Sequence, residues 1–167
     1  PSALIPEAVE AHILPGYDHL VEDSAALASA AASACQPGDA ALEAAFHEAF
    51  DAWISISHIT FGPAEVDGRY FALSFWPDTR GMTGRSLSGL IADEDPVVED
   101  PEDYATVSIA ARGFYALEFL LFDAETSRAG TAEYRCALVQ AITTDIAATA
   151  RTIRDEWSAG FAELLLN

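Results

Sequence analysis

The chain contains no lysine, and its eight basic residues are all arginines. Against them stand 27 aspartates and glutamates, so the 167 residues carry a formal net charge of −19. A field of this sign repels nucleic acids and anionic membrane surfaces and attracts cations. The charge therefore argues against nucleic acid as a partner, although an acidic surface often serves solubility alone.

Long apolar runs and a secretory signal are also missing. No stretch of about eighteen uncharged apolar residues occurs, so we expect no direct membrane span. The sequence begins at Pro1, without an initiator methionine. We interpret this start as that of a processed or trimmed product, which leaves export open.

Cysteine is scarce as well, and the two that occur, Cys35 and Cys136, have no metal-ligand spacing. Two cysteines suit either a disulfide in an oxidising compartment or two buried thiols. Cys35 is expected at the far end of the first long helix, and Cys136 just inside the start of the last. Because these ends need not coincide in an up-and-down bundle, we expect free thiols.

The motifs of several enzyme classes are absent. The sequence has no Glu-x-x-His pair, no His-Glu-x-x-His, no phosphate loop and no nucleophile elbow. His12 and His19 are seven residues apart, and His47 and His58 are eleven apart. Each pair returns to one helix face, but neither is close enough for a single helix to chelate a metal. A metal would need ligands that converge from several helices.

The sequence is rich in apolar residues: hydrophobic residues make up 51% of it and charged residues only 21%. This composition is typical of packed helices. Capping residues and three- or four-residue apolar spacings predict an all-α, up-and-down helical bundle of about five helices. An aromatic-rich loop spans 59–82, within which 69–75 is the only strand candidate. The bundle forms one domain over 1–167. Helices are expected at 4–35 with a kink or break at Pro15-Gly16, at 39–58, 83–92 and 100–122, and from about Thr131 onward, with an apolar stripe that reaches Leu164.

The segment 113–122 is the best place to look for chemistry, because Glu118 stands alone in a dense apolar run. We expect Glu118 to be largely buried, and a buried carboxylate must be protonated, paired or bound to a cation. Tyr115 lies on the same helix face, and Arg112 three residues before it is a candidate partner. Gly113 provides a flat spot for another backbone or a ligand. The alternative is a purely structural ion pair of Glu118 with Arg112 or another arginine.

The aromatic loop carries Phe61-Gly62-Pro63 and the stretch from Tyr70 to Pro77. It could cover the core as a lid or form the wall of a ligand site. Aromatic side chains mostly fill cores, so a lid is the better interpretation.

Several of these segments together resemble the imelysin-like family, also called the M75 peptidase family. The resemblance rests on Leu14-Pro15-Gly16-Tyr17, Ala52-Trp53, Phe61-Gly62-Pro63, Phe75-Trp76-Pro77-Asp78 and the run from Gly113 to Phe122. The family's mark is Gly-x-His-x-x-Glu in such an apolar helix, and here Tyr115 stands at the histidine position. A phenol can ligate ferric iron but is a poor zinc ligand at neutral pH.

The resemblance implies a periplasmic or envelope-attached, exported protein tied to iron acquisition. Family members are usually about twice as long, with two helical bundles and the motif near their interface, so this chain resembles the N-terminal half. The implied partner is a second imelysin half-domain or a second copy of the chain. The implied ligand-binding residues are Arg112, Gly113, Tyr115 and Glu118, with Tyr115 and Glu118 as ligands for iron or another divalent metal.

The sequence thus predicts an imelysin-like binding protein associated with iron or metal uptake. One alternative is a metallopeptidase that uses Glu118, which the absence of a zinc triad disfavours; another is a structural half-domain with a decayed site. The ending Leu164-Leu165-Leu166 is unusually apolar for a terminus. We therefore expect the last helix to dock on the partner, with the Gly113–Glu118 face near that junction.

Overall fold

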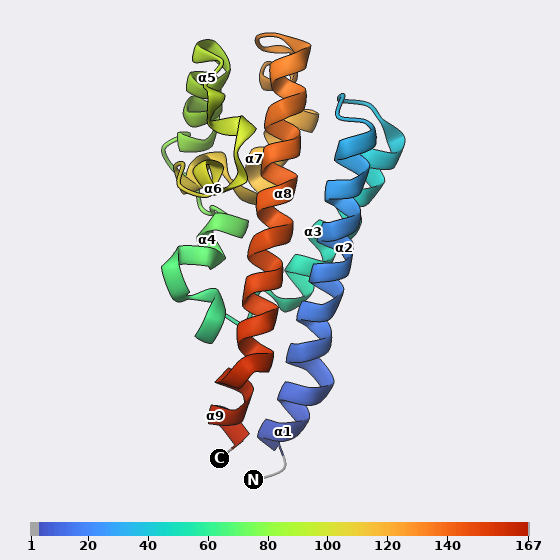
Figure 1. Cartoon of the computed structure of the whole chain (residues 1–167), viewed down its shortest axis with the longest axis vertical. Coiled ribbons are helices and arrows are strands. Elements are labelled where there is room, and N and C mark those ends of the chain that lie inside the picture. The colour runs from blue at the N-terminus through green and yellow to red at the C-terminus, as the bar shows by residue number, and fades with distance from the viewer. Residues whose placement is uncertain (1–3, 167) are drawn as a thin grey trace.

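A computed structural model describes residues 4–166 and shows an elongated bundle of helices (Figure 1). No strand occurs in this described part of the chain, so the predicted all-α fold is confirmed. The helices are α1 (Leu4–Ala8), α2 (Leu14–Ser33), α3 (Ala40–Ile56), α4 (Arg69–Leu73), α5 (Met82–Asp93), α6 (Pro101–Tyr104), α7 (Gly113–Phe122), α8 (Ala132–Glu156) and α9 (Ala162–Leu166).

The long helix α8 runs down the middle of the bundle and is packed by α2 and α7 (Figure 1). α2 lies antiparallel to α8 and packs against α3, which crosses behind α2 in this view, while α4 to α6 lie on the opposite flank of α8. The first and last helices, α1 and α9, meet at one end of the bundle. Within residues 4–166, no helix is both long and apolar enough to cross a membrane.

Local signals in the sequence set the starts of the long helices. The Asp39 side chain accepts a hydrogen bond from the Leu42 amide at 2.9 Å and caps α3. Thr131 caps α8 in the same way, accepting from the Tyr134 amide at 3.2 Å. The apolar stripes of these helices then close over the core, whose largest fully buried side chains include Tyr17, Trp53, Tyr104, Phe114 and Trp157.

The first helix stays continuous past the expected kink at Pro15-Gly16. Instead, one π-helical turn, η1 (Val9–Ile13), joins α1 to α2. Pro15 has no amide hydrogen for the carbonyl of Ala11, and its ring crowds that carbonyl. The backbone accommodates this by widening one turn earlier, within η1.

Two further expectations about the chain path are wrong. The strand candidate 69–75 contains the short helix α4, which buries Ala72 and Leu73. The single helix expected at 100–122 is two, because α6 ends at Tyr104 and α7 begins only at Gly113. Gly113 has a φ of +80°, which interrupts a right-handed helix.

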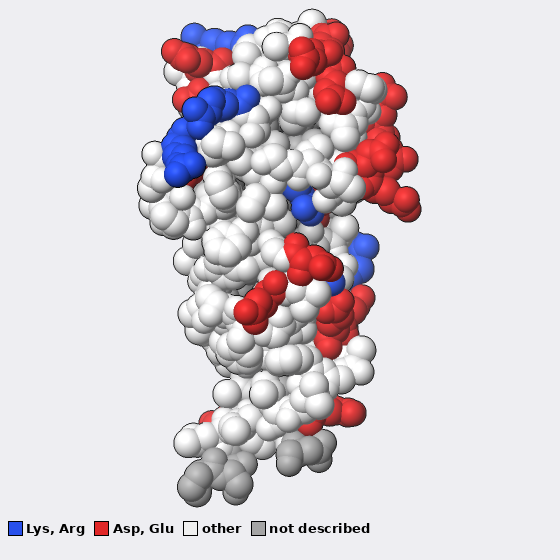
Figure 2. All heavy atoms as spheres, turned by 90° about the vertical axis from the view of Figure 1, so that its left-hand side faces the viewer, with Lys and Arg blue, Asp and Glu red and all other residues white. Residues whose placement is uncertain are grey.

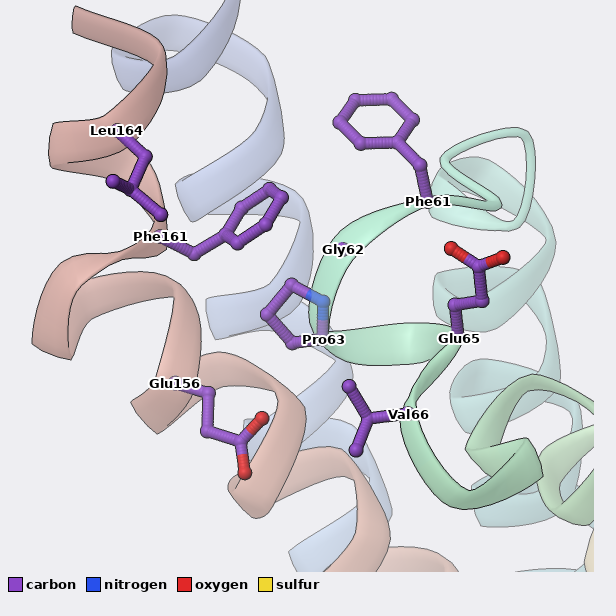
Figure 3. A pocket seen from close by; sticks show the side chains of 8 residues that line it. All are labelled: Phe61, Gly62, Pro63, Glu65, Val66, Glu156, Phe161 and Leu164. Atoms are coloured by element: carbon purple, nitrogen blue, oxygen red, sulfur yellow. The ribbon is translucent and has the colours of Figure 1, made fainter. Parts of the chain in front are cut away.

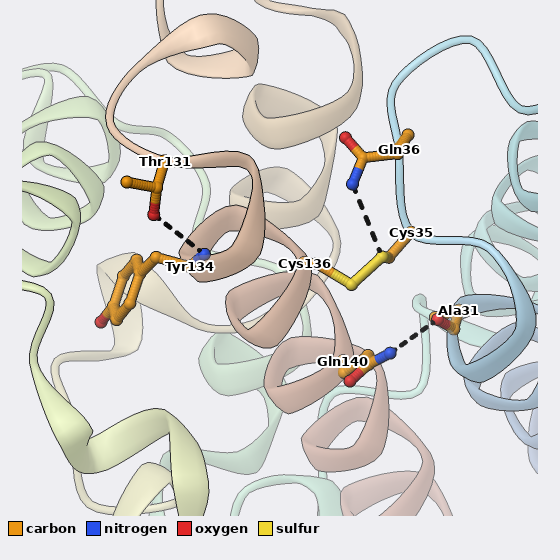
Figure 4. The surroundings of a disulfide bond; sticks show 7 residues. All are labelled: Ala31, Cys35, Gln36, Thr131, Tyr134, Cys136 and Gln140. Atoms are coloured by element: carbon orange, nitrogen blue, oxygen red, sulfur yellow. Dashed lines mark hydrogen bonds between the residues drawn. A yellow bond between two sulfur atoms is a disulfide. The ribbon is translucent and has the colours of Figure 1, made fainter.

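Cys35 and Cys136 form a disulfide, so the prediction of free thiols is wrong (Figure 4). Their Cα atoms are 5.0 Å apart, within the range that a disulfide needs. The reason is that α2 and α8 are direct antiparallel neighbours, which brings the end of α2 to the start of α8. Close by, the Gln140 amide donates to the Ala31 carbonyl at 3.2 Å and ties the same two helices together.

Candidate functional site

Gly113 is buried where the start of α7 meets the end of α4. A Cβ atom at this position would overlap the carbonyl oxygens of Ala72 and Leu73. The flat spot inferred from the sequence is therefore occupied by another backbone, that of α4. The glycine allows α7 to begin in this narrow space with a positive φ.

Arg112, the residue before α7, pairs with Asp145 in the middle of α8. Its Nε donates to Oδ2 at 2.8 Å and its Nη2 to Oδ1 at 2.9 Å, a bidentate arrangement. The side chains are only 13% and 5% exposed. Sequence reasoning missed Asp145; its position beside Ile142 and Ile146 on the apolar face of α8 was the available signal.

This ion pair lies beside a polar hollow of about 260 Å³ between α4, α6 and α8. Arg69 also lines the hollow and binds Glu156 through two hydrogen bonds of 2.6 and 2.9 Å. Nearby, the buried Tyr104 hydroxyl donates to the Ala111 carbonyl at 2.6 Å. Burial and, secondarily, the Asp145 charge raise the pKa of Tyr104 far above its ordinary value. The tyrosine therefore remains a neutral donor that fixes the segment leading into α7.

Glu118 is exposed, so the prediction that it is largely buried is wrong. α7 turns its other positions inward, burying Phe114, Leu117 and Leu121. Glu118 makes no hydrogen bond or ion pair with the chain within residues 4–166. The predicted partner Arg112 is instead engaged by Asp145, so the structural alternative of a Glu118–Arg112 pair is also wrong.

Tyr115 lies half-buried on the outward side of α7, in contact with two other aromatic rings. Its ring centroid is 5.7 Å from that of Trp76 and 5.7 Å from that of Phe50 on α3. The contacts continue through the buried Phe46 to Phe122, with centroids 5.6 Å apart. Within the predicted aromatic loop, Trp76 is thus a surface residue, 65% exposed.

These rings and Glu118 lie on neighbouring parts of α3, α7 and the loop that carries Trp76. Glu118 lies one turn before Phe122, which is 43% exposed, and both line a shallow hollow with Asp123. On the α3 side, the ring of His47 stacks on Phe122 with centroids 5.8 Å apart. We call this surface the aromatic face, defined by His47, Phe50, Trp76, Tyr115, Glu118 and Phe122.

The donor set on the aromatic face is small for a metal ion. In the part of the chain that the structure describes, no three residues among His, Cys, Asp and Glu are grouped closely enough to hold a metal. Tyr115 and Glu118 are neighbours on one face of α7 and offer a phenol and a carboxylate, both oxygen donors. Such a pair suits a hard ion such as ferric iron, with further ligands supplied from outside the chain.

Charge on the flank that carries α4 to α6 is distributed in patches (Figure 2). Acidic side chains gather in several separate groups, and basic ones lie toward the upper end and at mid-height in this view. Broad uncharged areas separate these groups. The negative charge on this flank therefore attracts cations in general, but the acidic side chains are not gathered at one place.

A larger, mostly apolar groove of about 610 Å³ lies near the end of the bundle where α1 and α9 meet (Figure 3). Phe61 and Pro63 approach it from one side and Phe161 and Leu164 from the other. A Cβ on Gly62 would come within 2.6 Å of the Phe161 ring, so this loop packs closely on the C-terminal helix. This part of the loop covers the core, since Pro63 is buried, and it also forms one wall of the groove.

Residues 13–167 match the family Imelysin (Peptidase_M75). The match covers most of the chain, so the protein belongs to the imelysin family. No curated protein matches the chain.

A crystal structure of an imelysin-like protein from Psychrobacter arcticum 273-4 has the same fold, with a TM-score of 0.83 and 19% sequence identity. The alignment covers 99% of this chain and 54% of that chain. The present chain therefore spans about half the length of this neighbour, as the resemblance implied.

Proposed function

We propose that this imelysin is a binding protein of the cell envelope, associated with the uptake of iron or another metal, whose ligand lies on the aromatic face. The observation that carries the proposal is the placement of Tyr115 and Glu118 together on the outward side of α7. The second and third of the family's three motif positions therefore lie where a ligand or a second body can reach them, while the first, Gly113, is buried. Gly113 and Arg112 support them by fixing where α7 begins.

The disulfide supports an exported location. Disulfides persist in oxidising compartments and are rare where thiols are kept reduced. The Cys35–Cys136 bond joins the end of α2 to the start of α8, the two longest helices of the bundle, which pack against each other. An envelope location is therefore consistent with how this fold is held together.

A second body would complete the ligand site. The neighbour from Psychrobacter arcticum is nearly twice as long as the part that this chain matches. Trp76 and Phe122 expose aromatic surface of the kind that protein interfaces favour. We expect a second imelysin half-domain, or a second copy of this chain, to pack there. α7 and α9 lie at different levels of the long axis (Figure 1), so a partner covering both would extend along the bundle.

Titration with ferric citrate tests the ligand site directly. Tyrosinate bound to ferric iron gives a visible charge-transfer absorption, and we expect this band to appear on addition of iron. Tyr115→Phe should abolish the band, and Glu118→Gln should weaken binding more than about tenfold, since it removes a charged ligand. Glu22→Gln changes an exposed carboxylate on α2 and should leave the titration unchanged.

Experiments on the same purified protein distinguish the iron site from a metallopeptidase site and test for a second copy. Metal analysis that finds zinc, together with cleavage of a peptide substrate that Glu118→Gln loses, would favour a metallopeptidase. A titration in which wild type and Tyr115→Phe behave alike would refute the proposed iron site. Light scattering of wild type against Trp76→Ser tests the partner: a dimer that the variant dissociates supports a second copy.

A further inference from the structure

Two of the four histidines meet on the surface, from positions 46 residues apart. The Nε2 atom of His12 lies 2.8 Å from the Nε2 atom of His58. The ring centroids are 4.9 Å apart and the ring planes differ by only 28°. Since the nitrogens are much closer than the centroids, the rings meet tip to tip in nearly one plane. The contact therefore joins one histidine from each of the two pairs noted in the sequence, His12 from the first and His58 from the second.

The two elements present these rings for different reasons. His12 lies in η1, the π-helical turn, and such turns recur at functional sites because they re-aim side chains. His58 follows the end of α3, where the helix dipole favours a cation. Both side chains are exposed, so an ion can reach the two nitrogens from solvent.

The hydrogen bond between the rings defines the chemistry available. Two imidazole nitrogens share a proton only if one ring is neutral and offers its lone pair. A metal ion that replaces this proton is held at about 2.0–2.1 Å from each nitrogen. The nitrogens therefore need to separate by only on the order of 1 Å, which exposed side chains achieve by small rotations.

We propose that His12 and His58 form a two-histidine site for a divalent transition-metal ion of the Cu²⁺ or Zn²⁺ type. Imidazole nitrogen is a preferred ligand of these ions. Because no third histidine, cysteine or acidic residue joins the pair in the described part of the chain, water or an external ligand fills the remaining positions. The net charge of −19 raises the local concentration of cations around the protein. The site uses nitrogen ligands and shares no residue with the aromatic face.

Copper and zinc titrations test the site. Electron paramagnetic resonance of the protein with one equivalent of Cu²⁺ should show hyperfine coupling to two nitrogens. Calorimetry with Zn²⁺ should show one site. His12→Ala and His58→Ala should each weaken binding more than about tenfold, because even changes beside a ligand cost 10–100-fold. His19→Ala is the matched control: His19 is exposed, belongs to neither site, and its variant should bind as wild type does.

Two further variants distinguish the loss of a metal ligand from a loss of folding, and this site from the aromatic face. His58→Gln keeps a hydrogen-bonding side chain at this position but removes the imidazole, and it should lose metal binding while circular dichroism shows an unchanged fold. The double variant Tyr115→Phe/Glu118→Gln removes the proposed iron ligands and should retain the copper signal. Copper without nitrogen coupling, or a loss of binding in His19→Ala equal to that in His12→Ala and His58→Ala, would overturn the proposal.

Discussion

Arg112 and Asp145 hold the start of α7 against the middle of α8 through two parallel hydrogen bonds between mostly buried side chains. The two residues are 33 positions apart in the sequence. Because this pair fixes the direction in which α7 leaves the loop, it also decides which side of α7 faces outward. Tyr115 and Glu118 reach the surface as a consequence, so the ion pair positions the aromatic face without belonging to it.

Removing one partner of this pair should be costly. Asp145→Ala leaves the Arg112 guanidinium mostly buried without a counter-charge, and breaking such a pair costs about 3–5 kcal/mol. We expect the free energy of unfolding in urea to fall by about 3 kcal/mol, toward the lower end of that range, because Arg112 keeps some contact with water.

An exposed ion pair provides the matched control. Arg154 and Asp18 form a salt bridge of 2.6 Å, but their side chains are 39% and 50% exposed. Asp18→Ala should therefore cost less than about 1 kcal/mol. If Asp145→Ala were no more harmful than Asp18→Ala, the buried pair would not anchor α7. The double variant Arg112→Met/Asp145→Leu should recover part of the loss by removing both charges.

A substitution of Gly113 tests the close approach of α7 to α4. Gly113→Ala places a methyl group against two backbone carbonyls and forces a positive φ on alanine. The backbone conformation alone costs about 1–2 kcal/mol, and the overlap adds to it. Gly89→Ala is the control: it lies within α5 with open space around it, and should stabilise by about 0.5–1 kcal/mol. Thermal unfolding of the two variants should shift in opposite directions.

Local signals made much of this fold predictable. Asp39 and Thr131 are capping residues by type, and they cap α3 and α8. The apolar stripe of α8 likewise defines one buried face by its spacing alone. These features are short-range, so they can be inferred without knowing which helices become neighbours.

The candidate site was harder to infer because it depends on long-range packing. A dense apolar run suggested that Glu118 is buried, but α7 is only partly enclosed and turns this face outward. Nothing in the neighbourhood of Arg112 identifies Asp145 as its partner. The meeting of Cys35 with Cys136 likewise requires knowing that α2 and α8 are antiparallel neighbours.

Breaking the disulfide should destabilise the bundle through its unfolded state. The bond joins residues separated by 101 positions, and closing a loop of about 100 residues is worth up to about 4.7 kcal/mol in the chain-entropy model. We expect Cys35→Ser/Cys136→Ser to lose about 2–5 kcal/mol of unfolding free energy. Reducing agent should lower the urea midpoint of wild type and leave the variant unchanged. Mass spectrometry without reductant should show the loss of two hydrogens in wild type; full mass for two thiols would contradict the bond.

Acid should weaken the hydrogen bonds that two aspartates, Asp78 and Asp123, accept from backbone amides at the start of helical turns. Backbone hydrogen bonds from Thr83 and Met82 lower the pKa of Asp78, and those from Thr126 and Glu125, together with the Thr126 side chain, lower the pKa of Asp123. A carboxyl whose folded pKa is depressed stabilises the protein above its unfolded pKa, about 3.9. This contribution is lost as the pH falls through the folded value.

The double variant Asp78→Asn/Asp123→Asn tests this linkage, because asparagine retains a capping oxygen but does not titrate. The urea midpoint, measured from pH 7 to pH 3, should fall more steeply for wild type than for the variant, with the difference growing below about pH 4. Asp51→Asn is the control, since Asp51 lies inside α3 and caps no helix. Its profile should follow that of wild type. Parallel profiles for wild type and the double variant would show that these hydrogen bonds do not favour the charged carboxylates, since a depressed folded pKa must make the slope of stability against pH positive in this range.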